Sequence, residues 1–135
     1  CLISVFVNIV HTHNFSIPGE IEKEMINMFE HIDDRFLILG NTPSTSYSKA
    51  YYSYAAIYYN LSTSGGWYSS TTKEYMDNLD KTSTYLIEND CSNLINNLNY
   101  LKTRYILSYG SLCENLSKCG FVKKRESENI CLYYL

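Results

Sequence analysis

Histidine is the commonest general base and metal ligand, and this chain of 135 residues contains only three histidines. His11-Thr-His13 is the one candidate metal motif. Cleavage of a signal peptide just before His11 would leave histidine at the third position of a new amino terminus, an arrangement that chelates copper. Paired histidines are common in segments that bind no metal, and His31 suits the surface of a helix. We therefore predict no metal site and no cofactor.

Nucleophilic and phosphate-transfer chemistry lack their usual sequence settings. No serine lies in a G-x-S-x-G motif, and Gly65 and Gly66 lack both the lysine and the spacing of a P-loop. Asp33 and Asp34 are adjacent, so on a helix their side chains point about 100° apart and do not form a shared acid-base pair. We predict no catalytic residue and a protein that is not an enzyme.

Cysteine supplies the strongest chemical signal. Apart from Cys1, the cysteines are Cys91, Cys113, Cys119 and Cys131, all in the last third of the chain. An even number clustered in a small chain favours two disulfides formed in an oxidising compartment. Zinc is the competing use of four cysteines, but no two of them have the C-x-x-C spacing that structural zinc sites favour.

Helix geometry limits how these cysteines can pair. Cys91 and Cys113 would lie about 33 Å apart on one straight helix, too far for a disulfide. Either Cys91 pairs with Cys131 and Cys113 with Cys119, or the chain reverses near Gly110. We favour the first arrangement.

The amino-terminal segment is apolar. Residues Cys1 to Val10 include eight apolar residues and no charge, which resembles the core of a signal peptide and is too short for a membrane span. A buried strand or a first helix would explain the same pattern. We expect residues 1–12 to be a signal-peptide remnant and residues 13–135 to form a single helical domain that is secreted.

Export would expose three sequons to glycosylation. The candidate sites are Asn14, Asn60 and Asn115, each followed by a residue other than proline and then serine. In a chain rich in Asn and Ser such triplets also arise by chance, so they indicate only where glycans would attach. The net charge of -3 and the pI near 5.5 argue against binding to nucleic acid.

Apolar periodicity predicts a first helix from about Pro18 to Leu39. Pro18 suits a first turn, acidic residues complement the positive end of the helix dipole, and Gly40 suits the end. The apolar side chains recur at steps of three and four residues, as on one helix face. They are Ile21, Met25, Met28, Ile32, Phe36 and Leu39.

A second helix is predicted from Tyr47 to Leu61, with a pair of strands as the alternative because the region is rich in aromatic residues. Tyr52 and Tyr59 lie off its main stripe, so we expect them on the surface as interaction residues. The main stripe consists of Tyr47, Tyr51, Tyr54, Tyr58 and Leu61. The loop that follows carries Trp67, the only tryptophan, which would bind a partner if exposed or else pack across a helix end.

Helix three is predicted after a capping box from Thr71 to Glu74, and Asp90 is expected to cap a fourth helix from Cys91 to about Tyr109. The segment Phe121–Leu135 is expected to be irregular or a short strand. The sequence thus predicts an all-α fold, an antiparallel bundle of about four helices with a disulfide-tethered carboxyl-terminal tail.

The fourteen tyrosines, the bias toward Asn and Ser, and the late cysteines resemble the composition of secreted antigens of parasitic flatworms. This resemblance rests on composition and implies a host-facing secreted protein. We expect a non-enzymatic interaction protein that presents a Tyr-rich helical surface to a protein partner or to another copy of itself.

The alternative is a carrier of lipid or of a small apolar ligand, with amphipathic helices around a cavity. Saposin-like proteins use six cysteines along the chain for such a fold, whereas here four lie after residue 90.

Overall fold

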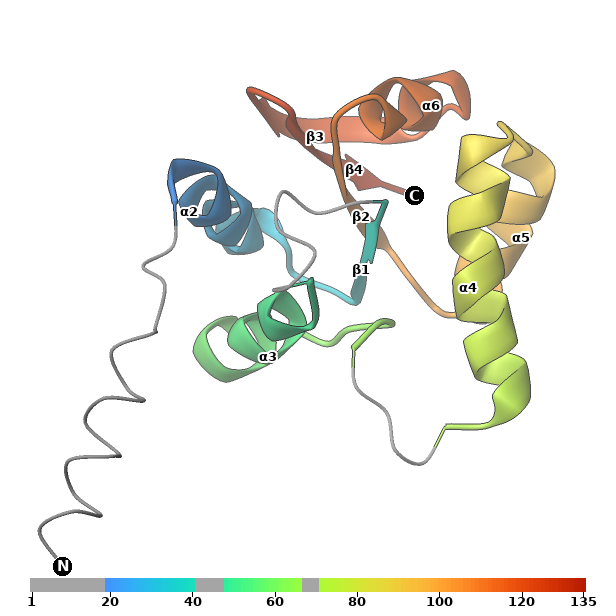
Figure 1. The fold of residues 1–135 in the computed structure, drawn as a ribbon, viewed down its shortest axis with the longest axis horizontal. Helices are drawn as coiled ribbons and strands as arrows, with labels where there is room; N and C mark the ends of the chain where they lie inside the picture. The colour runs from blue at the N-terminus through green and yellow to red at the C-terminus, as the bar shows by residue number, and fades with distance from the viewer. Residues whose placement is uncertain (1–18, 41–47, 67–70) are drawn as a thin grey trace, which may run out of the picture.

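The computed structural model describes residues 19–40, 48–66 and 71–135 (Figure 1). Within these ranges the chain forms five α-helices, one short 3₁₀-helix and four β-strands. In chain order the elements are α2 (Glu20–Asn27), η1 (Met28–His31), β1 (Phe36–Leu39), α3 (Ser48–Tyr59), α4 (Lys73–Ile87), α5 (Cys91–Tyr100), β2 (Tyr105–Tyr109), α6 (Leu112–Lys118), β3 (Val122–Ser127) and β4 (Ile130–Tyr134).

The four strands form one mixed sheet in the order β1-β2-β4-β3. β1 and β2 run parallel although α3, α4 and α5 separate them in the sequence. The β2–β4 and β4–β3 pairs are antiparallel, with Tyr105 opposite Tyr134 and Val122 also opposite Tyr134. β2 and β4 are therefore central strands, while β1 and β3 form the two edges.

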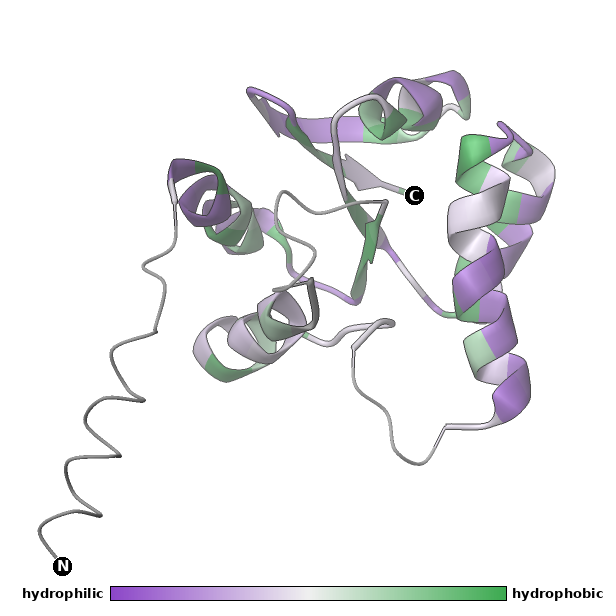
Figure 2. Cartoon of the chain, in the orientation of Figure 1, coloured by the Kyte–Doolittle hydropathy of each residue, from purple (hydrophilic) through white to green (hydrophobic). Residues whose placement is uncertain are grey.

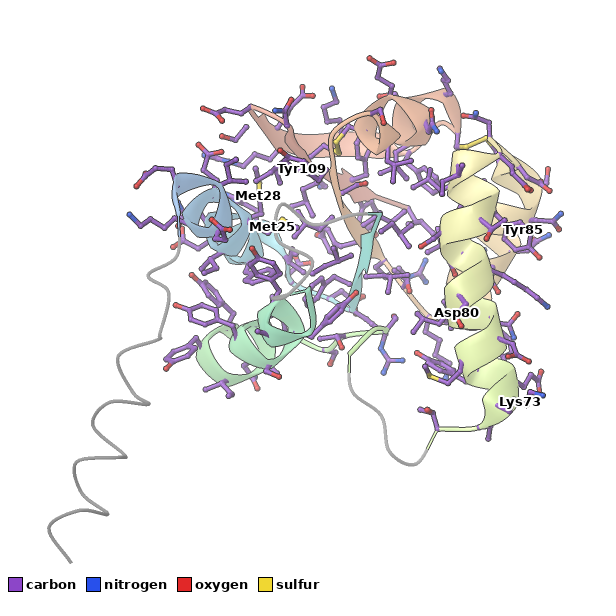
Figure 3. The ribbon with its side chains drawn as sticks, in the orientation of Figure 1. Met25, Met28, Lys73, Asp80, Tyr85 and Tyr109 are labelled. Atoms are coloured by element: carbon purple, nitrogen blue, oxygen red, sulfur yellow. A yellow bond between two sulfur atoms is a disulfide. The ribbon has the colours of Figure 1, made fainter. Side chains whose placement is uncertain are left out.

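Helices cover both faces of this sheet and give the molecule three layers (Figure 1). Neighbouring strand residues point to opposite faces, so Phe36 joins one core and Leu37 the other. Figure 3 shows Met25 and Met28 directed from their helices toward the sheet, on the side of Tyr109. The first core consists of Met25, Met28, Phe29, Ile32, Phe36, Tyr51, Ala55, Tyr105, Leu107, Ile130 and Leu132, and the second of Leu37, Leu39, Leu86, Leu94, Leu98, Leu101, Ile106, Cys113, Leu116, Cys131 and Tyr133.

The predicted all-α bundle is wrong, because a four-stranded mixed sheet occupies the centre of the structure. β1 and β2 are buried on both faces, so their sequences read as nearly continuous apolar runs rather than as alternating patterns. Such runs cannot be told from buried helix by periodicity alone. Figure 2 shows these apolar strands between the helices and the hydrophilic strand β3 at the edge.

The first predicted helix continues only to His31, through α2 and η1, and its last part is strand β1. The segment between them competes with helix formation. Asp34 Oδ1 accepts a hydrogen bond from the backbone N–H of Arg35 at 2.6 Å, and Asp33 Oδ1 accepts one from Tyr105 Oη at 2.7 Å. The predicted apolar stripe is largely core all the same, since Met25, Met28, Ile32, Phe36 and Leu39 are buried.

The fourth predicted helix also ends early, because α5 stops at Tyr100. The N–H of Lys102 donates to Asn99 O at 3.0 Å and the N–H of Thr103 to Leu98 O at 2.9 Å, which is the Schellman pattern of a helix end. Lys102 takes the left-handed backbone conformation of this motif, with φ +54°. Glycine usually fills that position, so the sequence carried no stop signal before β2.

The two sheet edges are protected in different ways. Tyr52 and the segment 62–64 lie along β1, where the Phe36 N–H donates to Ser62 O and the Ser64 N–H to Phe36 O. β3 has no such cover among the described residues, but Lys123, Lys124 and Arg125 are exposed on it. Charged edge residues of this kind oppose pairing with strands of other molecules.

Candidate functional site

Helix α3 is apolar on two sides, and this makes it the first candidate for a binding element. Its inner side places Tyr51 and Ala55 in the first core. Burial and, to a smaller extent, the nearby Glu22 raise the pKa of Tyr51 to about 12.

Tyr52 and Tyr59 are less exposed than the sequence predicts. Both side chains are partly buried and pack against the first core. The Tyr52 hydroxyl accepts a hydrogen bond from the Ile38 N–H at 2.9 Å and donates to Ile38 O at 3.3 Å, which satisfies the backbone at the edge of β1. The Tyr59 ring meets Phe29 edge-on, with ring centroids 5.7 Å apart. Tyrosines occur all round α3, so their spacing did not show which side is buried.

Replacing Tyr52 by phenylalanine tests this structural role. The substitution removes only the hydroxyl, and it leaves the Ile38 N–H and C=O without the partner that the structure gives them. We expect the free energy of unfolding to fall by about 1–3 kcal/mol in urea denaturation. Tyr58→Phe is the matched control, because its side chain is exposed, and should change stability by less than about 0.5 kcal/mol. Equal effects of the two substitutions would contradict the assigned hydrogen bonds.

The outer side of α3 presents a continuous apolar surface. Tyr54, Ile57 and Tyr58 are spaced by three and four residues, and their exposed fractions are 36%, 74% and 69%. The rings of Tyr54 and Tyr58 lie 4.4 Å apart between centroids. The small exposed residues Ala50 and Ser53 continue this side of the helix. We call the surface formed by Tyr54, Ile57 and Tyr58 the α3 face.

The α3 face carries no formal charge. The helix contains no Asp, Glu or Arg, and Lys49 is its single basic residue. Burial raises the pKa of Tyr59 on the neighbouring side, with smaller contributions from Glu30 and Tyr54. An uncharged aromatic surface of this kind can bind by apolar contact and by phenolic hydrogen bonds.

Comparison of the chain with known proteins gives no family. No family model, no curated protein and no solved structure matches it.

All four late cysteines form disulfides, as predicted, but the favoured pairing is wrong. Cys91 pairs with Cys119 and Cys113 with Cys131, with Cα atoms 5.1 Å and 5.9 Å apart. The first bridge joins the start of α5 to the end of α6, and the second joins α6 to β4. The alternative reversal of the chain near Gly110 is closer to the structure, since β2 returns the chain from the end of α5 before α6 begins.

The other predicted sites differ in accessibility. Asn60 directly follows α3 and is exposed. Asn115 is partly buried, and its Nδ2 donates to Leu86 O at 3.2 Å, so this side chain is less accessible to glycosylation than Asn60. Asn14 and Trp67 lie outside the described residues.

The two histidine predictions fall on different parts of the chain. The His11-Thr-His13 motif lies outside the described residues, and His31 is exposed on η1. The part of the chain that the structure describes contains no group of three or more His, Cys, Asp or Glu side chains able to hold a metal ion. None of its helices is long and apolar enough to cross a bilayer.

Proposed function

We propose that the chain is a secreted, non-enzymatic interaction protein that binds a protein partner through the α3 face. The observation that carries this proposal is the exposure of Tyr54, Ile57 and Tyr58 on one uncharged side of a helix. The centres of protein interfaces are enriched in aromatic residues and depleted in charge. The stacked tyrosines also lose little side-chain freedom on binding, because they have few rotatable bonds.

A protein fits this surface better than a lipid bilayer does. Helices that lie in a membrane interface combine an apolar face with a solvated face rich in Lys and Arg. The opposite side of α3 is instead buried in the first core. An α3 helix anchored in this way can present only a narrow aromatic strip, which suits a groove or a complementary helix on another protein.

Secretion is supported by the disulfides. Two bridges in so small a chain are consistent with an extracellular protein, because such bonds persist in oxidising compartments. Together with the compositional resemblance to secreted flatworm antigens, this makes an extracellular host protein the preferred partner and a second copy of the chain the alternative one.

The test compares the double variant Ile57→Asp/Tyr58→Ser with wild type. Sedimentation velocity over a concentration series measures self-association, and retention of extracellular host proteins on the immobilised chain measures binding to others. We expect wild type to show one of these and the double variant to lose it. Ile87→Asp is the matched control, because Ile87 is 60% exposed on α4.

Circular dichroism would confirm that both variants fold as wild type does. Binding that survives in the double variant, or is lost equally in Ile87→Asp, would overturn the proposal. So would the absence of any association by wild type in both assays.

A further inference from the structure

A groove separate from the α3 face runs along the end of the sheet where β1, β2 and β3 begin and β4 ends. One part is a polar pocket of about 350 Å³, and the other is a more apolar pocket of about 260 Å³. Asn99 and Arg104 line both pockets, so the two lie next to each other.

The polar part is strongly cationic. Arg35, Lys102 and Arg104 line it together with a single acid, Asp34. The local charge is thus +3 − 1 = +2, in a chain whose net charge is -3. Three cations gathered at one pocket of an acidic protein raise the local concentration of anions.

These cations have no carboxylate partner in the described part of the chain. The salt bridges found there join Lys23 to Glu20 and Lys123 to Glu126, at other sites. Asp34 accepts a hydrogen bond from the Arg35 N–H and Asp33 one from the Tyr105 hydroxyl, and neither carboxylate forms a salt bridge with the three cations. The cationic side chains are therefore available to a ligand.

The backbone beneath the cations is held in place by several hydrogen bonds. The N–H groups of Arg104 and Tyr105 both donate to Arg35 O, at 2.8 Å and 3.1 Å, and the Leu135 N–H donates to Arg104 O at 3.0 Å. Three chain segments are thereby joined at the groove. A pre-formed site of this kind loses less entropy on binding than a flexible one.

Lys102 stands at a position that favours glycine. Its φ of +54° places a long side chain in the left-handed region, where glycine is free of strain. The helix dipole favours a cation at this end of α5, which offsets part of that strain. Lys102 also lines the polar pocket, where its ammonium group can meet an anion.

The second part of the groove gathers exposed apolar side chains. Ile95, Val122 and Tyr134 line it and are among the large hydrophobic residues that remain exposed in the structure. Cys119 forms part of the wall and is tied to α5 by its disulfide with Cys91. Apolar surface next to free cations matches a ligand with a charged head and a short apolar tail.

We infer that this groove binds a small amphiphilic anion, with a phosphate, sulfate or carboxylate head at Arg35, Lys102 and Arg104 and an apolar tail at Ile95, Val122 and Tyr134. The sequence analysis considered a carrier of lipid or of a small apolar ligand as the alternative function. This groove would restrict the ligands of such a carrier to small amphiphilic anions. It is independent of the α3 face, because the two sites share no residue.

Isothermal titration with three probes tests the assignment. Octyl phosphate has both the anionic head and the apolar tail of the proposed ligand. Inorganic phosphate has only the head, and octanol has only the tail. We expect octyl phosphate to bind at least about tenfold more tightly than either of the others, because only it uses both parts of the groove. Equal binding of inorganic phosphate and octyl phosphate would overturn the amphiphilic class.

Substitutions then locate the site. Arg104→Glu should weaken octyl phosphate binding by about tenfold or more, since it reverses a charge shared by both pockets. Arg125→Glu makes the same charge change on exposed β3, outside the groove, and should leave binding unchanged. A similar loss in both variants would show a general charge effect and would overturn the assignment.

Lys102→Gly separates function from folding. Glycine relieves the left-handed conformation, so we expect a higher urea midpoint together with weaker binding of octyl phosphate. A higher midpoint with unchanged affinity would remove Lys102 from the site and contradict the inference.

The phosphate head could also belong to a lipid at a membrane surface. Binding to vesicles of phosphatidylcholine with phosphatidic acid, measured with and without octyl phosphate, separates a membrane lipid from a free ligand. We expect soluble octyl phosphate to compete the protein off any such vesicles. Vesicle binding without binding of octyl phosphate would replace the groove by a surface interaction and overturn the inference.

Discussion

Replacing Cys113 and Cys131 together by alanine is expected to lower the free energy of unfolding by about 5 kcal/mol. The bridge closes a loop with a sequence separation of 18, and in the chain-entropy model a loop of this size contributes about 3.2 kcal/mol. Both sulfurs are also buried, with exposed fractions of 0% for Cys131 and 7% for Cys113. Removing them leaves space between α6 and β4 that adds about 1 kcal/mol for each position.

The bridge between Cys91 and Cys119 provides the matched comparison. This bridge closes a longer loop, with a sequence separation of 28. In the chain-entropy model it stabilises the fold by about 3.6 kcal/mol, which is only about 0.4 kcal/mol more than the bridge between Cys113 and Cys131. Its cysteines are less buried than Cys113 and Cys131. We expect the Cys91→Ala/Cys119→Ala variant to lose about 3.5 kcal/mol, because core burial outweighs loop length.

Denaturation of both double variants in urea would measure the two losses. A larger loss in the Cys91→Ala/Cys119→Ala variant would show that loop length dominates. Peptide mapping of the unreduced protein would establish the pairing independently, since Cys91 with Cys131 or Cys113 with Cys119 would contradict the structure.

Features set by local chemistry were predictable from the sequence. Asp90 caps α5 as expected, with its carboxylate accepting from the Asn93 N–H at 3.2 Å. The cap of α4 is Thr72, one residue after the predicted start of the capping box. The cysteines were identified as disulfide-forming, and most of the first predicted apolar stripe is buried. Each of these depends on residues close together in the chain, or on burial alone.

The sheet depends on partners far apart in the sequence, and here local patterns failed. β1 pairs with β2 across three helices, with Ile38 opposite Leu107. Nothing near Ile38 identifies that partner. The end of α5 could not be predicted because Lys102 stands where glycine usually marks a helix end. The apolar spacing typical of a helix therefore continues into β2. The tail was better predicted, since a short strand was one of its two expected forms.

Neither candidate site could be assembled from the sequence. The exposed side of α3 was predicted only in part, because Tyr52 and Tyr54 both fit a helical surface and only the hydrogen bonds to Ile38 show that Tyr52 faces the sheet. The groove combines Arg35 with Arg104 through pairing of the segments that precede β1 and β2. The one local signal was the pair of basic residues just before the apolar run of β2.

Phe36→Ala provides the sharpest test of the sheet, and we expect it to lower the free energy of unfolding by about 3–5 kcal/mol. Phe36 is fully buried, and its ring lies 5.4 Å from that of Phe29 and 5.6 Å from that of Tyr52, between centroids. The substitution therefore empties a site between β1, η1 and α3 and removes two aromatic contacts.

A bundle in which Phe36 stood in the last turn of a helix would lose much less, because helix ends fray and relax around a cavity. Val122→Ala is the matched control, since Val122 is 58% exposed on the edge strand β3 and should change stability by less than about 0.5 kcal/mol. Urea denaturation of both variants gives the comparison. A loss below about 2 kcal/mol at Phe36 would place this residue outside a rigid core and contradict its position in β1.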